Sequence, residues 1–125
     1  MKKKIIEYMW TLNDGGAETL VKDYALLLNK EKFDVIVVVN TINKSTGIKT
    51  ILQENGIRVI SIYKKWGYIS KVLFLLFNRA YIPFKLLRII EKENADCIHA
   101  HLTVLKYLKT ISHKIKGVKL FYTCH

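Results

Sequence analysis

Two adjacent glycines and two histidines are the residues of this sequence whose types and positions could form a ligand site. Gly15 and Gly16 follow a short apolar run, and His101 and His125 each end another apolar run. Glycine lets a ligand approach the backbone closely, and the free N–H groups at a helix start suit a phosphate or carboxylate. A histidine beside such a turn could act as a polar ligand-facing group or a base. Spacing alone leaves open whether the glycine turn binds a ligand or only ends a strand.

The elements that would position these residues alternate between strands and helices. Strands are predicted at residues 4–9, 33–39, 57–62, 96–101 and 118–125, and helices at 16–30, 45–53, 69–82, 83–93 and 103–115, with Pro83 ending one helix and opening the next. This alternation predicts an α/β, Rossmann-like three-layer domain with a mostly parallel five-stranded sheet in the order 3-2-1-4-5. In such a sheet ligands bind at the carboxyl ends of the strands, where the order reverses. Gly15, Gly16, His101 and His125 are therefore expected to be neighbours in space.

Two common nucleotide-binding patterns are missing from the turn. The sequence GxGxxG is absent, and the second strand ends in Asn40 where a dinucleotide-binding domain would carry an acid. No GK[ST] follows the glycines, so the turn is not a P-loop. These absences disfavour a dehydrogenase or a nucleoside triphosphatase.

The histidines allow a metal site, which the sequence disfavours. His99 and His101 are two apart on a strand and share a face, so with His125 they could bind a metal ion. No carboxylate or thiol has clear ligand spacing, and Asp96 lies at the other end of the strand. We therefore expect no metal ion, a core position for His99 and a surface position for His113.

Positive charge is concentrated in the second half of the chain. The formal net charge is +11, of which residues 63–125 contribute twelve Lys and Arg against three Asp and Glu. This asymmetry suggests an anionic partner, or else only a solvated basic surface. Nucleic acid is disfavoured because no recognised binding motif accompanies the charge. Cys97 and Cys124 have no CxxC spacing and are expected to be reduced.

A mixed apolar and basic stretch could contact an anionic membrane surface. Phe74 and Leu75 fall outside the apolar face of the helix predicted from Ile69, and the residues expected to meet lipid are Trp66, Lys71, Phe74, Leu75 and Arg79. The alternative is that Phe74 and Leu75 pack against a second domain or a partner subunit. No apolar run approaches the roughly 18–20 residues of a spanning helix.

Three segments together resemble a known enzyme family. The stretches "GGAETLVKDYALLL", "ADCIHAH" and "VKLFYTCH" resemble the N-terminal domain of family-4-like glycosyltransferases of the GT-B fold, and the resemblance covers essentially all 125 residues. It implies two facing Rossmann-like domains, of which the N-terminal one binds the acceptor. The C-terminal one would bind a nucleotide-sugar through a pair of glutamates. The implied reaction retains anomeric configuration and uses no metal ion or other cofactor.

The resemblance also implies roles for single residues. Gly15 and Gly16 would lie near the donor phosphates and the acceptor, His125 would approach the transferred sugar as the catalytic residue, and His101 would line the cleft. Residues 1–125 are expected to be one truncated acceptor-side domain without its donor domain, and to be inactive alone.

The expected function is hexosyl transfer from a nucleotide-sugar to a lipid-linked or polysaccharide acceptor. The implied place is the cytoplasm, peripherally on the inner face of the plasma membrane. The alternative function is a non-catalytic module, a split or degenerate glycosyltransferase subunit that docks on membrane or on a partner.

Overall fold

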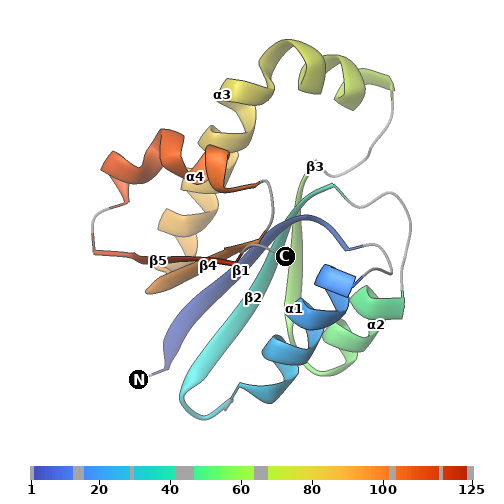
Figure 1. Cartoon of the computed structure of the whole chain (residues 1–125), viewed down its shortest axis with the longest axis vertical. Coiled ribbons are helices and arrows are strands. Elements are labelled where there is room, and N and C mark those ends of the chain that lie inside the picture. The colour runs from blue at the N-terminus through green and yellow to red at the C-terminus, as the bar shows by residue number, and fades with distance from the viewer. Residues whose placement is uncertain are drawn as a thin grey trace.

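Five strands form one sheet, all parallel, in the order β3-β2-β1-β4-β5 in the computed structural model (Figure 1). The structure describes residues 2–12, 16–28, 30–41, 47–63, 68–101, 104–115 and 117–123. The strands are β1 Lys3–Thr11, β2 Phe33–Thr41, β3 Arg58–Tyr63, β4 Cys97–His101 and β5 Lys119–Thr123. The helices are α1 Gly16–Leu27, α2 Gly47–Glu54, α3 Tyr68–Glu93, α4 Leu105–Ile111 and the 3-10 helix η2 Ser112–Lys114. The predicted fold class and strand order are confirmed.

The helices form two outer layers around the sheet. Figure 1 shows α1 and α2 on one face and α3 and α4 on the other. The β-branched run of β2 is buried against both layers: Val35, Val37 and Val39 belong to the core on the α1–α2 face, and Ile36 and Val38 to the core on the α3–α4 face. This two-sided burial is what a nearly continuous β-branched run predicts for a central parallel strand.

The sequence predicted that Pro83 ends one helix and opens the next, and this prediction is wrong. It lies inside the single 26-residue helix α3, whose ribbon changes direction along its length in Figure 1. A proline inside a helix costs about 3 kcal/mol and bends it. Ile82, Leu86 and Ile90 are buried at four-residue spacing from one side of the proline to the other. Burial of each such side chain contributes roughly 1.5–3 kcal/mol, which offsets the cost of the proline.

The layers leave part of the sheet less covered. The edge strand β5 exposes three large side chains, Leu120, Phe121 and Tyr122, at 39%, 55% and 43%. Tyr24 on α1 is 43% exposed. Within the described parts of the chain, none of the helices combines the length and the apolar character needed to span a bilayer.

Candidate functional site

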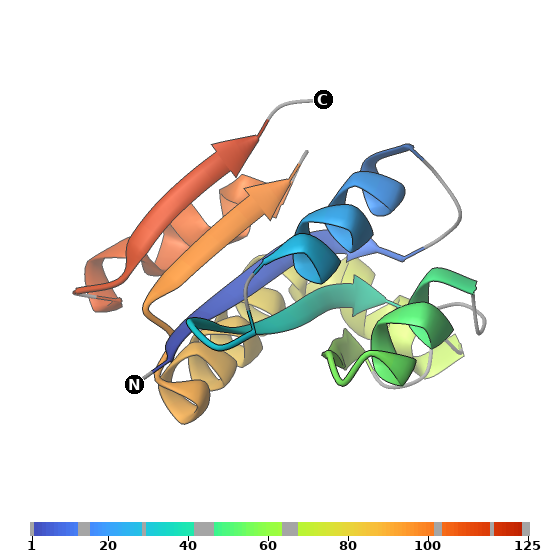
Figure 2. The ribbon, with the colours of Figure 1, turned by 90° about the horizontal axis from the view of Figure 1, so that it is seen from below.

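The sheet reverses its direction of winding between β1 and β4, and two predicted site residues lie at this point. β1 pairs in parallel with both β2 and β4. The chain leaves β1 into α1 on one face and leaves β4 toward α4 on the other, and Figure 2 shows both strands running toward the same edge. Gly16 is the first residue of α1, and His101 is the last residue of β4 and fully buried. Gly15 and His125 lie outside the described residues, so their predicted positions stay predictions.

The start of α1 has the polarity of an anion site. Unpaired N–H groups and the helix dipole place partial positive charge at the N-terminus of a helix. Glu18 lies in the first turn of α1, where a negative side chain is favourable. The same field would favour an anionic ligand at this helix start.

The Glu7 cluster, which we define as Glu7, His99 and His101, lies on the α1 face of the sheet. Glu7 on β1 is in register with His99 on β4, and His101 follows two residues later on the same face. His101 Nε2 lies 2.7 Å from Oε2 of Glu7, and His99 Nδ1 lies 3.1 Å from the same oxygen. The two imidazole centroids are 4.0 Å apart. Each ring therefore turns one nitrogen toward a single carboxylate.

The burial of the Glu7 cluster decreases toward α1. Glu7 is 3% exposed, whereas 20% of the His99 side chain is exposed. The ring of Tyr24 on α1 lies with its centroid 6.0 Å from that of His99. The expected core position of His99 is therefore only partly right, because its ring is half-buried beside a carboxylate.

Glu7 is the residue that the sequence reasoning missed. The argument against a metal site relied on the absence of a carboxylate or thiol at clear ligand spacing in the sequence, and the sheet brings in a carboxylate that such spacing does not reveal. Potential ligand atoms of Glu7, His99 and His101 all lie within 4.8 Å of one another. A glutamate in the middle of an apolar strand, as in "KIIEYM", was the available signal.

A second polar group is buried on the opposite face of the sheet. The Tyr8 hydroxyl donates a 2.6 Å hydrogen bond to Oδ1 of Asn40, the residue that stands where a dinucleotide-binding acid would be expected. Burial raises the pKa of Tyr8 well above its usual value, and burial likewise raises the pKa of Tyr63 to about 12. These tyrosines therefore stay neutral near neutral pH and act as hydroxyl groups, not as bases.

The proposed lipid-contacting residues are only partly described. Trp66 lies outside the described residues, and Lys71, Phe74, Leu75 and Arg79 lie on α3 in a part where only the backbone is described. Further along the same helix, Phe84 is 54% exposed and the Arg88 guanidinium lies 5.5 Å from its ring centroid.

The remaining histidine and cysteine agree with simple expectations. His113 lies exposed in η2, as predicted. Cys97 is a free thiol that is only partly buried, and desolvation raises its pKa. Cys124 lies outside the described residues.

The sequence comparison supports a family, and the comparison with solved structures supports the fold. The sequence profile described as Glycosyltransferase Family 4 matches residues 14–125. A search of curated proteins finds no match.

Two solved structures share the fold. A glycosyltransferase from Rickettsia africae aligns with a TM-score of 0.62 at 14% identity over 98% of this chain, which spans 30% of that protein. The C-terminal domain of a hydrogenase from Pyrococcus furiosus aligns with a TM-score of 0.65 at 18% identity, over 98% of this chain and 94% of that domain. At such identities these structures support the fold alone, and similar folds host different chemistries.

Proposed function

Because this chain belongs to glycosyltransferase family 4, we propose that it is the acceptor-side domain of a retaining glycosyltransferase. The enzyme transfers a hexosyl group from a nucleotide-sugar to a lipid-linked or polysaccharide acceptor. The observation that carries the proposal is the family match over residues 14–125, joined to the position of Gly16 and His101 at the switch point. A separate donor domain supplies the nucleotide pocket, so residues 1–125 are inactive alone.

The proposed chemistry uses the start of α1 as an electrostatic aid. In sugar transfer the bond between the anomeric carbon and the donor phosphate breaks, and the acceptor hydroxyl loses its proton as the new glycosidic bond forms. The nucleoside diphosphate leaves with the electron pair and gains negative charge. N–H groups at the turn of Gly15 and Gly16 stabilise that charge, because they lie at the positive end of the α1 dipole. His125 contacts the transferred sugar, and His101 supports the cleft wall.

The test joins this chain to a donor domain and measures transfer. The chain is fused to, or co-expressed with, a family-4 donor domain, and radiolabelled sugar transfer to lipid extract is counted. We expect His125→Ala to lower kcat by about 100-fold or more. Gly16→Val should also reduce transfer, because a branched side chain would obstruct close approach to the α1 start. His113→Ala is the matched control and should leave transfer unchanged, since His113 is exposed in η2. Full activity in both His125→Ala and Gly16→Val would refute the site assignment.

A non-catalytic docking module is the second candidate, and the outer surface of α3 favours it. Exposed Phe84 lies next to Lys85 and Arg88, and a groove of about 560 Å³ between β3 and α3 is lined by Lys85, Arg88 and Lys92. An exposed aromatic ring beside a cationic side chain suits the interface of an anionic membrane. In the sequence, these residues follow the stretch from Trp66 to Arg79, for which we propose contact with the inner face of the plasma membrane.

Vesicle flotation separates lipid docking from general basicity. The chain should float with vesicles that contain phosphatidylglycerol and much less with pure phosphatidylcholine. Two double variants, Phe74→Ser with Lys71→Glu and Phe84→Ser with Arg88→Glu, should each weaken binding by about fivefold or more. The control is Phe121→Ser with Lys119→Glu, which removes the same side-chain types from the exposed strand β5. An equal loss in the control, or binding that ignores anionic lipid, would refute the α3 surface.

A further inference from the structure

The Glu7 cluster holds a buried carboxylate without a fixed cation. Glu7 is 3% exposed and His101 fully buried. Among the described residues, no lysine or arginine forms an ion pair with Glu7, whose partners there are His99 and His101. Removing a carboxylate from water costs several kcal/mol unless an opposite charge or several hydrogen bonds compensate it. In the described part of the chain, the two imidazole rings are the groups that lie within hydrogen-bond distance of this carboxylate.

The donor atoms of the cluster already lie at spacings close to those of a metal site. Zinc binds imidazole nitrogen and carboxylate oxygen at about 2.0–2.2 Å, so neighbouring ligand atoms of a tetrahedral ion lie about 3.3 Å apart. Here the His99 Nδ1 to Glu7 distance is 3.1 Å and the His101 Nε2 to Glu7 distance is 2.7 Å. All three ligand groups meet within 4.8 Å.

We propose that Glu7, His99 and His101 form a binding site for a divalent transition-metal ion of the zinc type. Two imidazoles and one carboxylate form a ligand set that zinc accepts, with a fourth position open to water. Mixed nitrogen and oxygen donors favour zinc, cobalt, nickel or copper over magnesium and calcium, which prefer oxygen alone. Access is from the side of His99, the partly exposed member beside Tyr24. This inference concerns these three residues and does not rest on the proposed sugar transfer.

Ion binding changes the state of both rings. Without an ion, an N–H at His99 Nδ1 and one at His101 Nε2 can donate to the carboxylate. With an ion, the same nitrogens must offer lone pairs, so in each neutral ring the proton moves to the other ring nitrogen. The Glu7 carboxylate then pairs with a full positive charge in place of two N–H dipoles.

The ion would join two strands that are distant in sequence. Glu7 and His99 are 92 residues apart and adjacent in the sheet. An ion that binds only the folded chain raises stability according to its concentration relative to Kd. It would also hold His101 in one orientation at the end of β4.

Calorimetry and cobalt spectroscopy test this site on the full chain. The protein is stripped with a chelator and titrated with ZnCl₂, and separately with CoCl₂ while the visible absorption of cobalt is recorded. We expect one ion per chain, cobalt bands of four- or five-coordinate geometry, and a rise in Tm with zinc. Glu7→Gln and His99→Gln should each weaken binding by at least about tenfold. His113→Gln should bind as the unaltered chain does, because it removes an exposed histidine outside the cluster.

The choice of variants separates a loss of metal binding from a loss of folding. Glu7→Gln keeps the shape of the buried side chain, and His99→Gln alters the partly exposed member. Circular dichroism without metal shows whether each variant is folded, and binding is compared only among folded variants. Absence of zinc binding to the unaltered chain would overturn the proposal. Zinc affinity in Glu7→Gln and His99→Gln equal to that of the unaltered chain would also overturn the proposal. So would weaker binding in His113→Gln, because either result would place the ion elsewhere.

Discussion

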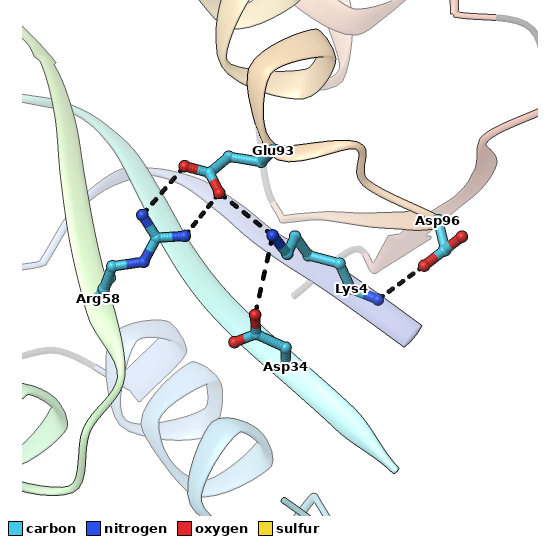
Figure 3. Close-up of polar contacts among 5 residues, drawn as sticks. All are labelled: Lys4, Asp34, Arg58, Glu93 and Asp96. Atoms are coloured by element: carbon cyan, nitrogen blue, oxygen red, sulfur yellow. Dashed lines mark hydrogen bonds and ion pairs between the residues drawn. The ribbon is translucent and has the colours of Figure 1, made fainter. Parts of the chain in front are cut away.

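Two groups of charged side chains lie on this sheet, and their carboxylates are compensated in different ways. At the amino end of the strands, the Arg58 guanidinium donates two hydrogen bonds of 3.0 and 2.6 Å to Glu93, and Lys4 Nζ adds one of 3.4 Å (Figure 3). Glu7 is at least as buried as Glu93, yet in the described chain its partners are the two histidines. Within the described chain, one carboxylate therefore has lysine and arginine partners and the other has histidine partners.

The difference separates a structural role from a binding role. The side chain of Glu93 is 10% exposed, and its guanidinium partner, which is 55% exposed, keeps most of its hydration. Such a pair avoids much of the desolvation cost and links the end of α3 to β3. In the described chain, the Glu7 carboxylate is buried beside two imidazole rings and forms no ion pair with a lysine or arginine. A ligand site is expected to carry a cost in folding free energy while it is empty.

Neutralising Glu93 should give the largest effect. Glu93→Gln removes the charge that two cations share, and should lower the free energy of unfolding by about 1.5–3 kcal/mol. Urea denaturation followed by circular dichroism measures the change. Glu91→Gln on the same helix is the control, because Glu91 is exposed. Equal changes in the two variants would mean that the ion pairs of Glu93 do not stabilise the fold.

The acid side of the stability curve should report the same ion pair. The hydrogen bond from Arg58 is the main cause that holds the pKa of Glu93 below its usual value of 4.5. The unfolded chain therefore takes up this proton at a higher pH than the folded chain does. The contribution of Glu93 is complete above about pH 4.5 and is lost as pH falls through the lowered pKa. Urea midpoints between pH 6 and pH 3 should fall less steeply in Glu93→Gln than in the unaltered chain, and parallel curves would contradict this assignment.

The same isosteric change at Glu7 should act in the opposite direction. In chelator-treated protein, Glu7→Gln removes a buried charge and keeps the side-chain shape. We expect stability to stay the same or to rise by up to about 1 kcal/mol, as happens when buried charges are replaced. With zinc present the order should reverse, because only the unaltered chain gains from the ion. If Glu7→Gln without metal costs as much as Glu93→Gln, the two clusters are equivalent and the comparison fails.

The sheet could be predicted from the sequence because its signals are local. Alternating strands and helices, with the β-branched run of residues 35–39, determine a parallel sheet, and the chirality of crossovers limits the order. The switch point and the place of Gly16 and His101 follow from that order. The prediction at Pro83 was wrong because it relied only on a local rule for helix ends. The packing of Ile82, Leu86 and Ile90 maintains α3 on both sides of the proline.

The Glu7 cluster could not be predicted because it depends on register. Glu7 meets His99 only when β1 and β4 align at one particular offset, and no pattern within either segment specifies that offset. A polar residue between Ile6 and Tyr8, in a strand expected to be covered on both faces, was a sign of a special environment. The partner of that residue is a property of the assembled sheet.

The smallest change in stability is expected at Asp34, which pairs with Lys4 at the amino end of the strands. Its Oδ2 lies 3.8 Å from Lys4 Nζ, and 48% of its side chain is exposed. Water screens such a pair, so Asp34→Asn should change the free energy of unfolding by less than about 0.5 kcal/mol.

A double-mutant cycle decides whether Asp34 acts through the shared lysine. Lys4 also contacts Glu93, so Asp34→Asn could leave the lysine nearer to Glu93 and strengthen that pair. Stability is measured for Asp34→Asn, Glu93→Gln and the two combined, at low and high salt. Additive changes within about 0.5 kcal/mol would mean that the Arg58–Glu93 pair stabilises the fold by itself. A larger coupling energy that disappears at high salt would mean that Asp34 and Glu93 act together through Lys4 Nζ, which Figure 3 shows between them.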